Sequence, residues 1–219
     1  MNSVIFMKLI IIRHGDPDYE HDTLTPKGVR EAKLLSERIS KLDVKAFYCS
    51  PLGRAQDTAS YTLDKMNRSA QTLPWLCEFE GKILSGLKYV SCWDRLPSEW
   101  TKYPEHYDYN EWYNSKIMRH GNVERKYKTV CNGIDKLLKK HGYEHQGNIY
   151  KVNNSNHDTI VLFCHFGVYR AAFGQACVVG VVLILLLQTA AQQQFEVALI
   201  FVHHGLIEVV GAAGKADKL

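Results

Sequence analysis

Two histidines stand where a side chain is well placed to do chemistry. His14 and His165 each follow a short run of apolar, β-rich residues, at positions 8–12 and 159–164. A neutral imidazole is a good nucleophile toward phosphorus, and it also binds and orients anionic groups. Because both histidines come directly after apolar runs, the pair is a candidate for a catalytic site.

Two arginines and a glutamate complete a set suited to phosphate chemistry. Arg13 precedes His14 directly, and Arg54 follows a third apolar stretch. Guanidinium groups hold phosphate oxygens in forked hydrogen bonds. A carboxylic acid can protonate a departing oxygen, and Glu78 is suited to this role, although Glu80, two residues further on, is an alternative. The set predicts phosphoryl transfer, and no cluster of carboxylates in the sequence suggests a metal or another cofactor.

The apolar runs predict the elements that position the two histidines. Residues 8–12 and 159–164 are apolar without alternation, which is typical of strands buried on both faces of a sheet. In parallel sheets the functional edge lies at the carboxyl ends of the strands. If these two strands are neighbours, His14 and His165 meet at one edge of the sheet.

The order of the other elements favours a parallel sheet covered by helices. A threonine and a proline open a helix over residues 25–39, a strand follows at 46–49, and a second helix runs from residue 50 to about 65. The alternation of strands and helices predicts an α/β fold. Helical spacing of apolar residues returns at 124–140.

A segment rich in aromatic residues interrupts this order between residues 81 and 122. It holds three of the four tryptophans, and we interpret it as an inserted lid. Tyr89, Trp93 and Trp100 are candidate substrate contacts, with packing of the insertion itself as an equally weighted alternative.

The end of the chain, from about residue 173, has an atypical pattern. Residues 176–187 are wholly apolar. Because a membrane span needs about 20 apolar residues, this shorter run predicts a buried helix or strand and no membrane partner. The closing strands expected of a sheet are not recognisable in this part of the sequence.

The composition is that of one soluble domain spanning residues 1–219. The net charge is +4 and no stripe of lysine and arginine occurs, so we expect no nucleic-acid partner. The six cysteines lack metal-binding spacing and mostly have apolar neighbours. The first residues lack the features of a signal peptide, which together with reduced cysteines predicts a cytoplasmic location.

The ordered set of motifs resembles the histidine phosphatase superfamily, the phosphoglycerate mutase-like family, over about residues 7–172. The matching residues are Arg13-His14-Gly15, Leu24-Thr25-Pro26-Lys27-Gly28, Ser50-Pro51-Leu52-Gly53-Arg54-Ala55, Glu78 and His165. An Arg-His-Gly tripeptide alone is weak evidence, and its second copy at 119–121 follows no apolar strand. The resemblance implies a three-layer α/β sandwich with a mostly parallel central sheet.

The resemblance also implies a role for each residue of the set. His14 would form a covalent phosphohistidine, while Arg13, Arg54 and His165 would bind the transferred phosphoryl group. Glu78 would protonate the leaving oxygen, and the family spacing before Gly81 favours it over Glu80. The implied substrate is a small phosphorylated metabolite.

Two departures from the family pattern favour hydrolysis over mutase chemistry. Mutases carry an asparagine seven residues after the motif arginine, where this chain has Glu20. They also carry a pair of adjacent arginines beyond the acid, which this sequence lacks. We therefore expect a phosphomonoesterase, with a phosphoglycerate mutase or a non-catalytic phosphate-binding module as alternatives.

Overall fold

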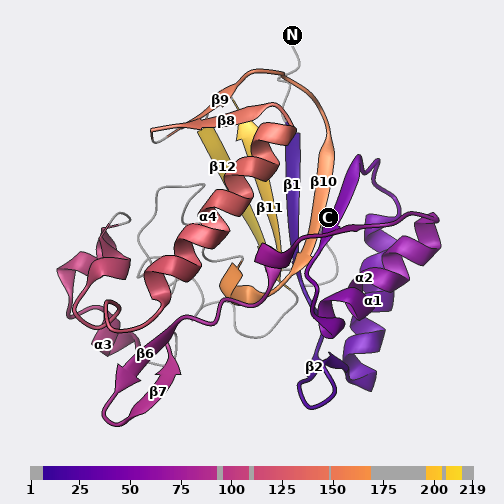
Figure 1. Ribbon diagram of the computed structural model, residues 1–219. Coiled ribbons are helices and arrows are strands. Elements are labelled where there is room, and N and C mark those ends of the chain that lie inside the picture. Colours follow the sequence, from indigo (N-terminus) through magenta and orange to yellow (C-terminus); the bar gives the residue numbers. More distant parts are fainter. Residues whose placement is uncertain are drawn as a thin grey trace.

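A computed structural model describes residues 7–92, 96–108, 111–147, 149–168, 196–203 and 206–213 (Figure 1). Its centre is a six-stranded sheet in the order β12-β11-β1-β10-β4-β5. The strands are β1 (Met7–Arg13), β4 (Ala46–Cys49), β5 (Gln71–Thr72), β10 (Thr159–Cys164), β11 (Glu196–His203) and β12 (Leu206–Ala213). β1, β10, β4 and β5 pair in parallel, whereas β11 runs antiparallel to both of its neighbours, β1 and β12. The predicted α/β fold with a mostly parallel sheet is confirmed.

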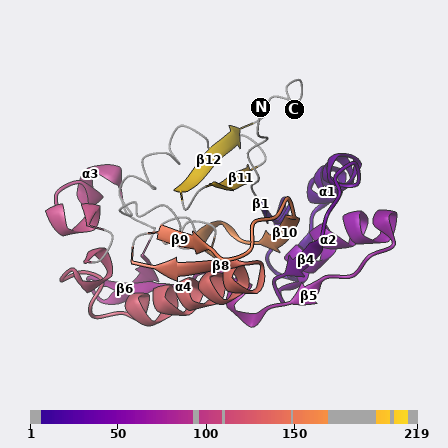
Figure 2. The same ribbon diagram turned by 90° about the horizontal axis from the view of Figure 1, so that it is seen from above.

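Helices cover both faces of this sheet (Figure 2). Helices α1 (Pro26–Ile39) and α2 (Gly53–Met66) lie on one face, and α4 (Val123–Lys140) lies on the other. Successive residues of β1 divide between the two layers: Ile10 and Ile12 pack toward α1 and α2, while Leu9 and Ile11 join the cluster on the α4 side. This division explains why the strand is apolar without alternation.

The two strands that precede the histidines are hydrogen-bonded neighbours. β1 and β10 pair in parallel, with Arg13 opposite Cys164 at the end of the register. The backbone N–H of His14 then donates to the Cys164 carbonyl at 3.0 Å. His14 and His165 therefore leave the sheet side by side at its carboxyl edge, as expected.

The aromatic-rich segment folds outside the central sheet. It contains the hairpin of β6 (Lys82–Ser85) and β7 (Lys88–Ser91), followed by three short helices, α3 (Pro97–Trp100), η2 (Pro104–Tyr107) and η3 (Trp112–Asn114). Trp112 is buried against Tyr113 and Tyr127. Tyr89 is 68% exposed on β7. Trp93 lies outside the described residues, and for Trp100 only the backbone in α3 is described.

The second Arg-His-Gly tripeptide lies just before α4 and follows no strand, as its sequence context predicts. Arg119 and His120 are exposed there. Gly121 has a packing role, since a Cβ atom on it would lie 1.7 Å from the carbonyl oxygen of Lys82. The remaining elements are β2 (Pro17–Asp18), β3 (Thr23–Leu24), η1 (Pro74–Leu76), β8 (Tyr143–Gln146) and β9 (Ile149–Val152).

The end of the chain supplies two strands that sequence analysis did not recognise as closing strands. β11 pairs antiparallel with β1, and β12 pairs antiparallel with β11. The apolar run at 176–187 lies outside the described residues. In the part of the chain that the structure describes, none of the helices combines the length and apolar character that a membrane crossing requires.

Ending the chain after residue 172 should destroy cooperative folding, because it removes β11 and β12. Met7 through Ile12 would lose their pairing with β11, leaving a long apolar edge on the central sheet. We expect the truncated chain to be insoluble or to melt without a cooperative transition. A chain ending after residue 213, which keeps both strands, is the matched control. A soluble truncated protein that melts like the full chain would contradict this prediction.

Candidate active site

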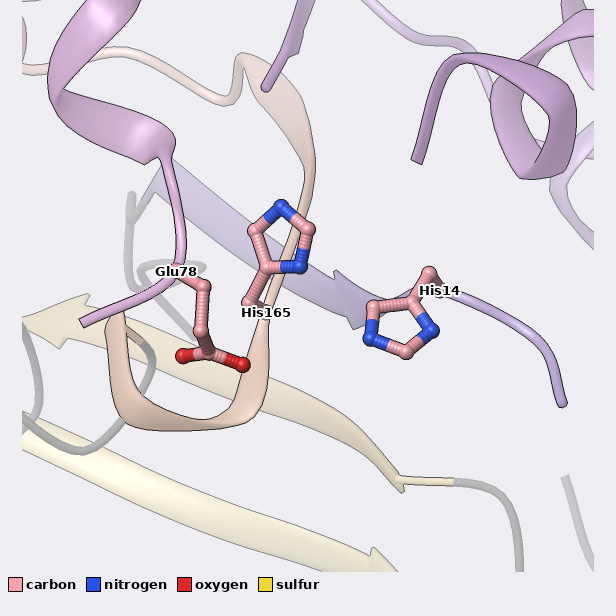
Figure 3. A group of neighbouring side chains, drawn as sticks. All are labelled: His14, Glu78 and His165. Atoms are coloured by element: carbon pink, nitrogen blue, oxygen red, sulfur yellow. The ribbon is translucent and has the colours of Figure 1, made fainter. Parts of the chain in front are cut away.

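The two strand-end histidines form the centre of the site (Figure 3). The ring centroids of His14 and His165 are 5.1 Å apart and the rings are tilted by 55°. Both side chains are buried, with 5% and 0% of their surfaces exposed. The predicted meeting of the two imidazoles is therefore present, and both rings are largely covered by protein.

Hydrogen bonding leaves one nitrogen of His14 free to react. His14 Nδ1 lies 2.8 Å from the carbonyl oxygen of Gly15, which can only accept, so Nδ1 carries the proton. The lone pair of the neutral ring is then on Nε2. Burial lowers the pKa of His14 to about 4, and the charges of Arg13 and Arg54 add to this effect. The imidazole is thus neutral at physiological pH, as a nucleophile must be.

Glycines let the loop after β1 pack tightly against the start of α1. A Cβ on Gly15 would lie 2.9 Å from the Gly28 carbonyl, and a Cβ on Gly28 would lie 2.2 Å from the carbonyl of Asp16. Thr25 caps α1 by accepting from the Gly28 N–H. Thr58 on α2 accepts from the Gly15 N–H at 3.0 Å. The two motifs around Gly15 and Gly28 therefore fix one loop beside the nucleophile.

His165 is held by a serine from the neighbouring strand end. Its Nε2 lies 2.8 Å from Ser50 Oγ, whereas its Nδ1 is buried without a hydrogen-bond partner. Burial, followed by the charges of Arg54 and His14, lowers the pKa of His165 to about 3. A donor hydroxyl on Ser50 would place the ring proton on Nδ1, which makes that atom a neutral hydrogen-bond donor.

Arg54 projects from the first turn of α2 and is fixed by an acidic residue. Its Nη1 donates to Asp22 Oδ1 at 2.6 Å, and its Nε is buried without a partner. Asp22 also accepts from the Gly53 N–H at 2.7 Å. A Cβ on Gly53 would lie 2.2 Å from the Asp22 carbonyl oxygen, so the contact requires glycine. Sequence analysis missed Asp22, which lies in a polar loop without a motif of its own.

Arg13 lies at the exposed end of β1. Its charge contributes to the lowered pKa of His14 and also favours ionisation of Glu78. Both predicted arginines therefore act electrostatically on the same group of side chains. Their combined charge suits an anion at this edge of the sheet.

Glu78 enters the site from the loop after η1. Its Oε1 accepts from the backbone N–H groups of Phe79 and Gly167, at 2.8 and 3.0 Å. Burial nevertheless raises the pKa of Glu78 above its ordinary value. Metal-ligating atoms of His14, Glu78 and His165 all lie within 4.8 Å of one another. Glu80 is exposed, so the structure brings Glu78 and not Glu80 to the histidines through these contacts.

Comparison with known proteins identifies the family of this chain. The model of the histidine phosphatase superfamily (branch 1) matches residues 9–188. The chain belongs to the histidine phosphatase superfamily, as the ordered motifs predicted.

Solved structures with the same fold include three phosphatases. The alpha-ribazole phosphatase from Shigella flexneri is 17% identical, with a TM-score of 0.57 over 97% of this chain and 100% of that one. A mycobacterial glucosyl-3-phosphoglycerate phosphatase complexed with VO3 is 14% identical, with a TM-score of 0.61 over 95% of this chain and 99% of that one. A mutant phosphoserine phosphatase from Entamoeba histolytica in complex with phosphoserine is 17% identical, with a TM-score of 0.60 over 93% of this chain and 95% of that one. At these identities the likeness shows a shared fold.

One curated relative is a 2,3-bisphosphoglycerate-dependent phosphoglycerate mutase from Thermoplasma acidophilum. It is 36% identical to this chain over 73 residues, a match that covers 29% of this chain and 36% of the relative. The chain thus matches little more than a third of the length of that relative.

Proposed function

We propose that this protein is a metal-independent phosphomonoesterase that works through a phosphohistidine on His14. The observation that carries the proposal is a pair of buried nitrogens without partners, Arg54 Nε and His165 Nδ1. Arg54 Nε is a hydrogen-bond donor, and His165 Nδ1 is one in the tautomer in which Ser50 donates to Nε2. Buried donors are normally satisfied, so an acceptor-rich ligand fits this position. A phosphoryl group offers three oxygen acceptors and the negative charge that Arg13 and Arg54 attract.

The first step transfers the phosphoryl group to the protein. His14 Nε2 attacks phosphorus while the bond from phosphorus to the ester oxygen breaks. Protonated Glu78 gives its proton to that oxygen, which leaves as a neutral alcohol. Arg13, Arg54 and His165 stabilise the charge on the three equatorial oxygens. The raised pKa of Glu78 keeps more of the acid form available at working pH.

The second step releases phosphate. The Glu78 carboxylate takes a proton from water, whose oxygen attacks phosphorus as the bond to His14 Nε2 breaks. Glu78 is thereby reprotonated and His14 returns to its neutral form. The same carboxyl group thus acts first as acid and then as base.

Two sequence features support hydrolysis over a mutase reaction. Glu20 replaces the asparagine of mutases, and the paired arginines beyond the acid are missing. The phosphatase names of the solved relatives agree with this choice, and the mutase relative keeps the second reaction as the alternative. Turnover that requires 2,3-bisphosphoglycerate would favour the mutase. A binding module would bind phosphate without turnover.

Activity should persist in excess EDTA, and vanadate should inhibit it. Arg13, Arg54 and His165, and no metal ion, are assigned to stabilise the negative charge of the transition state. Vanadate mimics the five-coordinate phosphorus of that state. The measurement is hydrolysis of a panel of small phosphorylated metabolites, with and without each reagent. Loss of activity in EDTA that one divalent ion restores would contradict the proposal.

A further inference from the structure

Three metal-ligating side chains converge from separate elements of the fold. His14 follows β1, Glu78 follows η1 and His165 follows β10. One donor atom from each lies within 4.8 Å of the others, and Figure 3 shows the side chains turned toward a common space. Two imidazoles and one carboxylate are a donor set that zinc enzymes use.

Each of the three side chains has an atom that could ligate a metal and that its other contacts leave open. His14 Nδ1 is engaged by the Gly15 carbonyl, which leaves Nε2. His165 Nδ1 is buried without a partner. Glu78 Oε1 accepts two backbone N–H groups, neither of which engages Oε2.

The existing contacts would also orient these donors as a metal site requires. Ligating histidines usually donate their other N–H to an oxygen. The carbonyl of Gly15 takes this role for His14, and the hydroxyl of Ser50, 2.8 Å from His165 Nε2, can accept from that nitrogen. A serine hydroxyl both donates and accepts, so it suits either ring tautomer of His165.

We propose that His14, Glu78 and His165 bind Zn²⁺, and that the bound ion inhibits the enzyme. The inhibition rests on the proposed function, because the ion would occupy the lone pair of the nucleophile and the carboxylate of the acid. Nitrogen donors favour zinc, whereas Mg²⁺ prefers oxygen ligands. Zinc–ligand distances of about 2.0–2.2 Å place tetrahedral donors roughly 3.4 Å apart. The present spread of 4.8 Å therefore requires a modest inward rotation of the side chains.

Positive charges near the site limit its affinity for Zn²⁺. Arg13 and Arg54 oppose a dication, but Arg54 is paired with Asp22 at 2.6 Å. The fourth position of the ion is open to an anion such as chloride or phosphate, which the same arginines attract. The site therefore suits a reversible inhibitor that EDTA removes.

Calorimetric titration of metal-free protein with zinc chloride tests the site without any turnover. We expect one Zn²⁺ per chain and no comparable heat with magnesium chloride. His14→Ala and Glu78→Gln should each weaken zinc binding by about tenfold or more. His120→Ala is the matched control, since His120 is an exposed histidine in the second Arg-His-Gly tripeptide, and its affinity should equal wild type. Circular dichroism of each variant checks that it is folded.

The outcomes separate this proposal from the proposed function. A protein that hydrolyses phosphomonoesters but binds no zinc, or whose zinc affinity His14→Ala leaves unchanged, would overturn the metal site alone. Zinc binding that depends on His14 and Glu78 supports the site even if no phosphoester is hydrolysed. In active protein, zinc should stop hydrolysis and EDTA should restore it; full activity with zinc bound would overturn the inhibition.

Discussion

Replacing His14 with alanine should lower kcat/KM for a phosphomonoester by about 10⁴- to 10⁶-fold, the scale seen when a catalytic nucleophile is removed. The neutral Nε2 of His14 is the atom assigned to attack phosphorus, and its ring is turned toward Glu78 and His165 (Figure 3). Arg13, Arg54 and His165 would remain, so phosphate binding should survive better than turnover. Steady-state kinetics and inhibition by phosphate measure the two effects separately.

His120→Ala is the matched control for this substitution. It removes a histidine from the same tripeptide sequence at an exposed position that follows no strand. We expect His120→Ala to have the kinetics of the wild type. Both His120→Ala and His14→Ala should melt at the wild-type temperature. Comparable losses for His14→Ala and His120→Ala, or substantial turnover by His14→Ala, would show that His14 is not the nucleophile.

Glu78→Gln should slow hydrolysis of an alkyl phosphate by about 10²- to 10⁴-fold. Glutamine has no proton to give to the leaving oxygen, and an alkoxide is a poor leaving group without one. The phenolate of p-nitrophenyl phosphate leaves readily unaided, so its initial transfer should suffer far less. Phosphohistidine hydrolysis can then limit the steady state, so the aryl substrate is compared through its burst phase. Equal losses on the two substrates would assign Glu78 to structure or to phosphate positioning.

Glu80→Gln is the paired control for the general acid. Glu80 is exposed, and we expect its substitution to leave both substrates unaffected. If Glu80→Gln greatly slowed hydrolysis of the alkyl substrate alone, Glu80 and not Glu78 would be the general acid.

The same assignment gives the direction of the pH dependence. Glu78 must be protonated for the first step, so kcat/KM for the alkyl substrate should fall as pH rises through the raised pKa of Glu78. His14 must be neutral, which its pKa of about 4 allows over most of the acidic range. In the Glu78→Gln variant, kcat/KM for the alkyl substrate should no longer decrease as the pH rises through this range.

The sequence predicted the elements whose signals are local. The apolar run ending at His165 coincides with β10, and the threonine-proline start predicted α1. The meeting of His14 and His165 followed from one rule on parallel strands, once β1 and β10 were taken as neighbours. These features depend on patterns that one short segment carries by itself.

Contacts between distant segments were not predictable in this way. Asp22 positions Arg54 across 32 residues, and the partner of His165 is a hydroxyl 115 residues away. Strand β11 completes the sheet on β1 from the far end of the chain. Such pairings depend on the tertiary fold, and neither composition nor periodicity encodes the partner.

Acid-quench trapping of the phosphorylated protein tests the central assignment most directly. The full chain is mixed with ³²P-labelled substrate, quenched, digested and mapped. We expect an acid-labile, base-stable adduct on the peptide that contains His14, formed and lost at rates compatible with turnover, and no adduct in His14→Ala. Label on a serine, or active protein that accumulates no adduct in a single turnover, would contradict the phosphohistidine mechanism.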